Sequence, residues 1–96
     1  MRSYEIMYIL KPDLPQEAIE AAQEKVIKII TDFGGEMVKV DNWGKRRLAY
    51  EINDLTEGFY VLLHFAGTTE AVNELERVLK ISEDFIRHLI VRQDEK

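Results

Sequence analysis

The fold is decided by the stretch FYVLLHF at residues 59–65, the clearest strand in the sequence. Its aromatic and aliphatic residues favour extended structure, and the Asn, Asp, Thr and Gly of residues 53–58 predict a turn before it. Residues 36–52 alternate loosely between apolar and polar side chains, and Gly44 within them indicates a bulge or bend. The two segments predict a hairpin whose first strand is long and interrupted.

A further strand and a helix are predicted on the amino-terminal side of this hairpin. Residues 4–10 (YEIMYIL) are almost continuously apolar and stop at a Lys-Pro-Asp sequence, which is typical of a strand closed by a turn. From about residue 16 to residue 33, apolar side chains recur at spacings of three and four, which predicts an amphipathic helix. They are Ile19, Ala22, Val26, Ile29, Ile30 and Phe33. Gly34 and Gly35 supply the left-handed residues that end such a helix.

A second helix and a last strand are predicted on the carboxyl-terminal side. Thr68 or Thr69 is suited to cap this helix. Its apolar face consists of Val72, Leu75, Val78 and Leu79. Residues 85–92 alternate again as a strand, and residues 93–96 are expected to fray.

The resulting order of elements is βαββαβ, which predicts a ferredoxin-like α+β fold with a four-stranded antiparallel sheet and two helices on one face. A chain of 96 residues can build one hydrophobic core but not two, so we expect residues 1–96 to form a single domain. This arrangement leaves the other face of the sheet, here called the open face, without a covering layer.

Alternation along the strands predicts which side chains meet the helices. These are Tyr4, Ile6, Tyr8 and Leu10 in the first strand and Phe59, Val61, Leu63 and Phe65 in the third. The open face then carries Met7, Ile9, Tyr60 and Leu62 beside Glu5 and His64. Because a solvated sheet face is usually polar, we expect Met7, Ile9, Tyr60 and Leu62 to contact a protein partner. The alternative is ordinary scattered apolar surface.

Composition and charge exclude several classes of protein. The chain has no cysteine, which rules out disulfides and thiolate metal sites and suits a reducing cytoplasm. Its first residues lack a basic region followed by a long apolar stretch, so we expect neither secretion nor membrane insertion. A net charge of −5, taken alone, argues against nucleic-acid binding, because Lys and Arg supply most sequence-independent affinity.

The densest cluster of positive charge in the sequence offsets the argument from net charge against nucleic-acid binding. Lys45, Arg46 and Arg47 follow the Trp-Gly bend and point in different directions along a strand, which suits a phosphate backbone. A solvated run that protects an edge strand is the alternative. Carboxylates collect around the first predicted helix, at Asp13, Glu17, Glu20, Glu24 and Asp32. We therefore expect the negative charge to be separated from the basic strands, so that RNA can approach them.

Catalytic and metal-binding motifs are absent from the sequence. His64 and His88 lack acidic or histidine partners at ligand-like spacing, and there is no glycine-rich phosphate loop and no nucleophile beside a base. We therefore predict that the chain is not an enzyme and needs no cofactor or metal.

Gly58 and Phe59 match the third-strand signature of an RNA-recognition motif. The match is weak, because alternation turns Phe59 toward the core instead of presenting it for stacking on a base.

Several stretches together resemble the bacterial small-subunit ribosomal protein six family. They are Arg2-Ser3-Tyr4-Glu5-Ile6, Gly34-Gly35, Trp43-Gly44-Lys45-Arg46-Arg47-Leu48-Ala49-Tyr50 and Gly58-Phe59-Tyr60. The resemblance covers about residues 2 to 92, and the Gly-x-Arg-Arg-Leu-Ala-Tyr stretch is its most specific part. Some members of the family carry a long, often acidic, carboxyl-terminal extension, whereas this chain stops at Lys96.

The resemblance implies a structural protein of the cytoplasmic ribosome without enzymatic activity. Such a protein binds the central domain of small-subunit ribosomal RNA together with ribosomal protein eighteen. Carried over by position, the RNA contacts would be Arg2, Arg46 and Arg47, followed by Lys45, Arg87 and Arg92. A different class of function stays open: a ferredoxin-like module that senses a small molecule or covers its open face with a second copy of itself.

Overall fold

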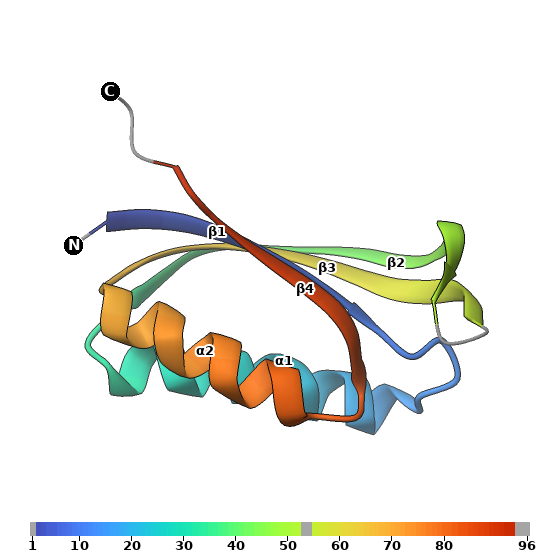
Figure 1. The fold of residues 1–96 in the computed structure, drawn as a ribbon. Helices are drawn as coiled ribbons and strands as arrows, with labels where there is room; N and C mark the ends of the chain where they lie inside the picture. The colour runs from blue at the N-terminus through green and yellow to red at the C-terminus, as the bar shows by residue number, and fades with distance from the viewer. Residues whose placement is uncertain (1, 53–54, 94–96) are drawn as a thin grey trace.

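The structure of the protein is a computed structural model that describes residues 2–52 and 55–93. Its elements are β1 (Arg2–Leu10), α1 (Gln16–Asp32), β2 (Glu36–Ile52), β3 (Leu55–Gly67), α2 (Thr69–Ile81) and β4 (Phe85–Arg92) (Figure 1). The strands pair in the order β2-β3-β1-β4, and each pairing is antiparallel. The predicted ferredoxin-like fold is confirmed.

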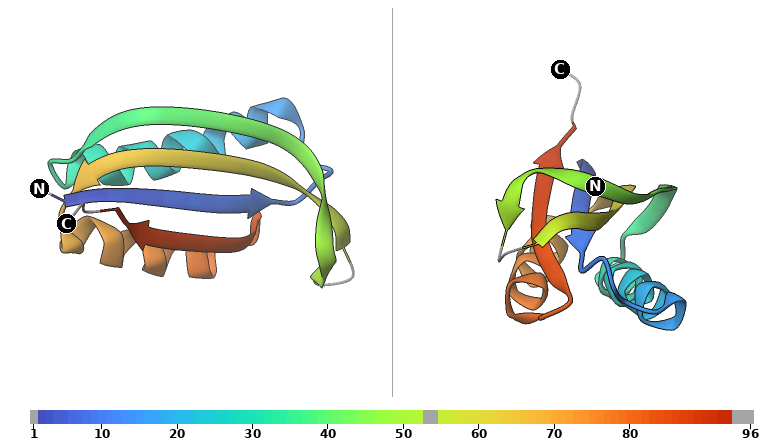
Figure 2. Two further views of the ribbon diagram at one scale, coloured as in Figure 1. Left: turned by 90° about the horizontal axis from the view of Figure 1, so that it is seen from above. Right: turned by 90° about the vertical axis from the view of Figure 1, so that its right-hand side faces the viewer.

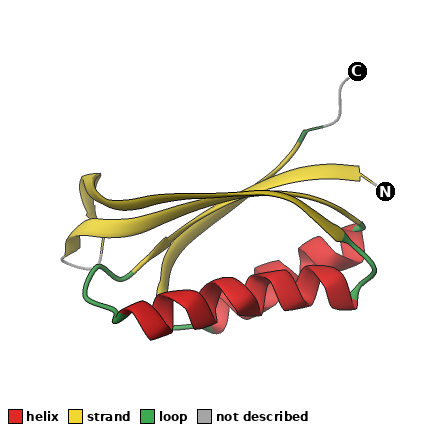
Figure 3. Ribbon diagram, turned by 180° about the vertical axis from the view of Figure 1, so that it is seen from behind, coloured by secondary structure: helices red, strands yellow, loops and turns green. Residues whose placement is uncertain are grey.

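Both helices lie against one face of the sheet, and the other face is bare (Figure 3). The core between helices and sheet is built from alternate residues of the two central strands, as predicted. The fully buried side chains include Ile6, Tyr8, Leu10, Val61, Leu63 and Phe65 from the sheet and Val26, Ile30, Leu75 and Leu79 from the helices. Neither described helix has the length and apolarity needed to cross a bilayer.

The end of α1 follows the predicted glycine signal in part. Gly34 has a φ of 83°, and its N–H donates to the carbonyl of Thr31, while the N–H of Gly35 donates to that of Ile30. Gly35 is not left-handed. A Cβ there would lie 2.6 Å from a backbone carbonyl of β3, so glycine is required for close approach. Phe33, predicted to face the core, follows the last helical residue and is 41% exposed.

The turn between β2 and β3 and the start of the carboxyl-terminal tail differ from expectation. The turn predicted at residues 53–58 is shorter, because Leu55 already belongs to β3 and pairs with Ile52; residues 53–54 lie outside the described part. Gln93 was expected to fray, yet its N–H donates to the carbonyl of Ser3 at 2.8 Å and its side-chain amide to Glu5 at 2.9 Å. The rest of the tail, residues 94–96, is not described.

Thr68, one of the two predicted candidates, is the cap of α2.

One polar atom is buried in this core without a partner. The hydroxyl of Tyr8 accepts and donates no hydrogen bond within the described part of the chain, and its ring packs edge-on against Phe85 at 5.1 Å between centroids. Burial raises the pKa of the Tyr8 hydroxyl, because the low-dielectric core disfavours the phenolate. A buried hydroxyl without a partner costs free energy, so this position is less than optimal.

Candidate RNA-binding and protein-binding surfaces

The hairpin of β2 and β3 is longer than the strands beside it. The last pair between β1 and β3 joins Leu10 to Phe59, so residues 55–58 of β3 have no β1 neighbour. Figure 1 and the left view of Figure 2 show this end of the hairpin rising on the open face and bending across the end of β1. We call residues 44–48 and 55–58 the arm.

A bulge at the base of the arm brings an aromatic pair and a cation together. Gly44 has a φ of 85°, and the register shifts between Asn42 and Gly44, which confirms the predicted interruption. Trp43, beside the shift, stacks on Tyr60 with 6.4 Å between ring centroids and 14° between planes. Arg46 donates from Nε to the carbonyl oxygen of Trp43 at 3.3 Å, with its guanidinium carbon 5.7 Å from the ring centroid. This cation–π contact favours one orientation of Arg46.

The predicted basic run lies on the arm and is exposed. Arg46 pairs with Gly58, and Lys45 and Arg47, one residue to either side, point to the opposite face of the hairpin. None of the three forms an ion pair with a carboxylate in the described part of the chain, although Glu57 is the cross-strand neighbour of Arg47. The arm therefore presents cations on both of its surfaces.

The other three predicted RNA-binding residues do not form one patch with the arm. Arg87 lies in the cross-strand row of Ile9 and Tyr60, which places it near the arm. Arg2 and Arg92 lie toward the opposite end of β1: at about 3.3 Å per residue, Arg92 is roughly 17 Å and Arg2 roughly 23 Å from the row of Ile9 and Arg87. The six cations thus divide into two groups at the two ends of the sheet.

The expected separation of charge holds only in part. The carboxylates of Glu17, Glu20, Glu24 and Asp32 lie on α1, away from the open face. Five other acidic residues lie on strands: Glu5, Glu36, Asp41, Glu51 and Glu57. The arm itself carries one carboxylate, Glu57, against three cations, so its local charge is positive among the described side chains.

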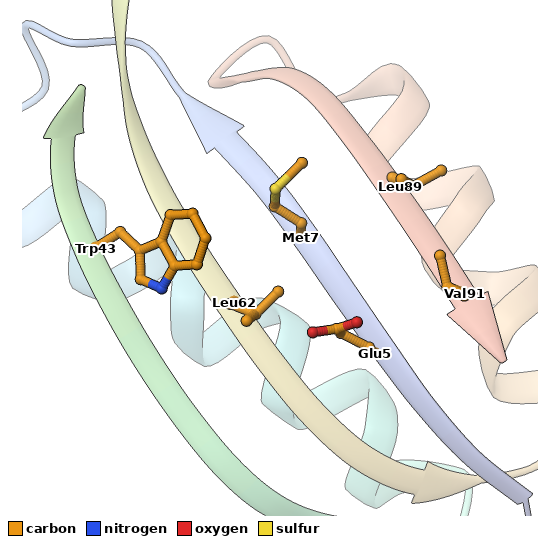
Figure 4. A pocket seen from close by; sticks show the side chains of 6 residues that line it. All are labelled: Glu5, Met7, Trp43, Leu62, Leu89 and Val91. Carbon is orange, nitrogen blue, oxygen red and sulfur yellow. The ribbon is translucent and has the colours of Figure 1, made fainter. Parts of the chain in front are cut away.

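Beside the arm, the open face is hollowed and apolar. The hollow has a volume of about 290 Å³ and is lined by Glu5, Met7, Trp43, Leu62, Leu89 and Val91 (Figure 4). Leu89 is 55% and Val91 43% exposed. Sequence reasoning assigned Met7 and Leu62 to this surface but missed the two β4 residues. Alternation in β4 puts Leu89 and Val91 on one side, but only their pairing with Met7 and Glu5 shows which side that is.

Ile9 differs in exposure from the other residues of the predicted protein-binding set. It lies on the open face by alternation, but it is only 4% exposed, because the arm bends over the end of β1 where it lies. Met7, Tyr60 and Leu62 keep partial exposure. A residue with so little free surface has little area to offer a partner.

The two histidines take part in polar contacts that the sequence did not predict. On the open face, Nδ1 of His64 lies 3.0 Å from Oε1 of Gln93, and Nε2 lies 3.4 Å from the Glu5 carboxylate. On the covered side, Nε2 of His88 lies 2.8 Å from the Glu76 carboxylate of α2. No group of three or more metal-ligating side chains gathers in the described residues.

Comparison with known proteins identifies the family. The family model described as "Ribosomal protein S6" matches residues 3–92. The chain belongs to the ribosomal protein S6 family. It is 55% identical over 97 residues to the small ribosomal subunit protein bS6 of Syntrophomonas wolfei, covering all of both chains. It is 52% identical to that of Moorella thermoacetica, covering all of this chain and 98% of the relative.

The fold is that of a solved S6 structure. The 30S ribosomal protein S6 from Thermotoga maritima superimposes with a TM-score of 0.90 at 35% identity, over 96% of this chain and 87% of that one. Membership of the S6 family makes this chain a structural component of the bacterial ribosome, and hence of the cytoplasm. The resemblance seen in the sequence is confirmed.

Proposed function

We propose that this S6-family chain binds the central domain of small-subunit ribosomal RNA through its cations while the open face holds ribosomal protein eighteen. The observation that carries the proposal is the arm, on which Lys45, Arg46 and Arg47 are exposed and form no ion pair with a described carboxylate. Cations presented in this way release counterions when they meet phosphates, which supplies affinity.

The chemistry of the two surfaces favours RNA as the ligand of the arm and a protein as the ligand of the hollow. The hollow beside the arm is apolar and contains the Glu5 carboxylate, which repels phosphate, so it favours a protein neighbour. A basic partner would also supplement the positive charge of a chain whose net charge is −5. RNA affinity of the chain alone is then weak and rises sharply when the partner is added. The role that we propose is structural and involves no catalysis.

Charge removal on the arm tests the RNA contact. Binding of a central-domain transcript is measured across a series of salt concentrations for the parent chain and for the double variant Arg46→Ala, Arg47→Ala. If both residues touch phosphates, the slope of log K against log salt falls by about one for each lost contact. The matched control is Lys25→Ala, Lys28→Ala, which removes the same charge from exposed positions on α1. An unchanged slope in the Arg46→Ala, Arg47→Ala variant contradicts the proposal.

The apolar hollow also supports a second candidate function. A ferredoxin-like module that pairs with a second copy of itself would bury Met7, Leu62, Leu89 and Val91. Sedimentation separates the two candidates, because a tight homodimer whose mass is indifferent to RNA favours self-association. A monomer that forms a complex with RNA and ribosomal protein eighteen favours the first.

A further inference from the structure

Among the residues whose burial the structure describes, the buried side chains of the open face lie at the end that the arm covers. Ile9 is 4% and Leu48 7% exposed, whereas Leu89, farther from the arm, is 55% exposed. Leu48 belongs to β2 within the arm, and Ile9 belongs to β1. Because a sheet face without helices would leave both side chains in water, their burial shows that the arm packs down on the sheet.

Gly58 allows this approach. A Cβ at position 58 would overlap Cγ2 of Ile9 and would lie 3.5 Å from Cδ2 of Leu48 and 3.4 Å from the carbonyl of Leu10. The left-handed glycines of the described chain are Gly34 and Gly44, so the backbone at Gly58 does not itself require glycine. Gly58 is needed for space, between the arm and β1.

The close contact lies directly under the basic run. Gly58 is the cross-strand partner of Arg46, and Glu57 is that of Arg47. Any lifting of the arm at Gly58 therefore displaces the two guanidinium groups together. It also moves Trp43, which stacks on Tyr60 and accepts the Arg46 hydrogen bond.

We propose that Gly58, Ile9 and Leu48 form a latch that holds the arm on β1 and so positions Arg46 and Arg47 for RNA. The three latch residues act through the arginines and do not touch the ligand themselves. This inference rests on the proposed function and adds positioning residues to it. It also gives Ile9 a role other than the protein contact expected from the sequence.

The variant Gly58→Ala tests the latch. The added methyl group pushes the arm away from Ile9, and affinity for a central-domain transcript is expected to fall about tenfold, the loss of one charged hydrogen bond. The emission of Trp43, the single tryptophan of the chain, is expected to shift in the free protein as its stacking on Tyr60 changes. Unchanged affinity and unchanged emission overturn the latch.

A compensating substitution distinguishes a displacement of Arg46 and Arg47 from a general destabilisation of the fold. Ile9→Ala in the Gly58→Ala background removes the Cγ2 atom that the new methyl group meets. RNA affinity and Trp43 emission should return toward the parent values, while the midpoint of urea unfolding should not recover, because buried apolar surface has been lost. Affinity that stays low in the double variant overturns the proposal, since the first loss then came from damage to the fold.

Two controls keep the result interpretable. If Gly58→Ala does not fold, Leu48→Ala loosens the latch from the other side, and the same drop in affinity with a Trp43 shift is expected; no change overturns the latch. The Arg46→Ala, Arg47→Ala variant is measured in parallel. If it leaves the salt dependence unchanged, the proposed RNA contact fails; if it weakens binding and the latch variants do not, only the latch fails.

Discussion

The two faces of the sheet use the same strands in opposite ways. On the covered face, Tyr8, Leu63 and Phe65 have no exposed surface, and both helices pack against them. On the open face, the same strands carry Met7 and Leu62, which stay partly exposed above a shallow hollow. The first face stabilises the fold, whereas the second is available for binding. Under the arm, the described part of the open face has a small core of its own, at Ile9 and Leu48.

The difference shows that folding and binding are separated by strand alternation. Neighbouring residues such as Leu62 and Leu63 have similar hydrophobicity, yet one is fully buried and the other faces outward. Substitutions at adjacent positions should therefore have unlike effects. This expectation can be tested in order of effect size.

The largest effect is expected for Phe65→Ala. Phe65 is fully buried and stacks on Tyr4 with 5.5 Å between ring centroids, so truncation leaves a cavity and removes an aromatic contact. The free energy of unfolding should fall by about 3–5 kcal/mol. Urea unfolding followed by circular dichroism measures it. A loss below about 1 kcal/mol would contradict the division between the faces.

A smaller effect of opposite sign is expected for Tyr8→Phe. Removal of a buried hydroxyl without a described partner should leave stability at pH 7 unchanged or raise it by about 1 kcal/mol. Burial raises the pKa of Tyr8 in the folded state above the value of about 10 expected in the unfolded state. Below about pH 10 the hydroxyl is neutral in both states. Above it, the unfolded chain loses a proton that the folded chain keeps, so the free energy of unfolding of the parent falls. The variant should lose less stability than the parent between pH 9 and pH 11, roughly the range around that value.

Urea midpoints of parent and Tyr8→Phe at the two pH values provide the measurement. The other tyrosines titrate in both chains, so the difference between the chains isolates Tyr8. A variant that is strongly destabilised at pH 7 would show that the hydroxyl has a partner after all.

The smallest effect on stability is expected for Leu89→Ala. Leu89 is 55% exposed, so its truncation should change the free energy of unfolding by no more than about 0.5 kcal/mol. The association with ribosomal protein eighteen that we propose, measured by calorimetry, should weaken about fivefold, which corresponds to about 1 kcal/mol. The matched control is Ile81→Ala, at a position 71% exposed at the end of α2 and away from the hollow. Equal effects of both substitutions on association would remove Leu89 from the binding surface.

Local patterns were sufficient for the elements of this fold. The spacing of Val26 and Ile30, the glycine after α1 and the alternation of residues 59–65 each report a short-range preference, and the observed elements follow them closely. Phe33 shows the limit of this approach. It continues the helical spacing but lies beyond the last turn, where the chain already leaves the core.

The sequence predicted which residues form the candidate site but not how the sheet arranges them. The cations of residues 45–47 and the apolar residues Met7 and Leu62 could be named, and the bulge at Gly44 could be placed. That Arg2 and Arg92 lie at the far end of the sheet depends on pairing between β1, β3 and β4, which involves residues distant in sequence. The burial of Ile9 depends on how far the arm bends, and the local sequence does not report it.

By itself, the sequence determined the order of the elements, the covered face and the family, because hydrophobic period, turn residues and motif spacing are encoded locally. Tertiary structure alone decided that β4 completes the open face with Leu89 and Val91, and that the arm closes over Ile9 at Gly58. Long-range pairing and bending are set by contacts between segments far apart along the chain. Their effect on a side chain's exposure appears only after all four strands are in register.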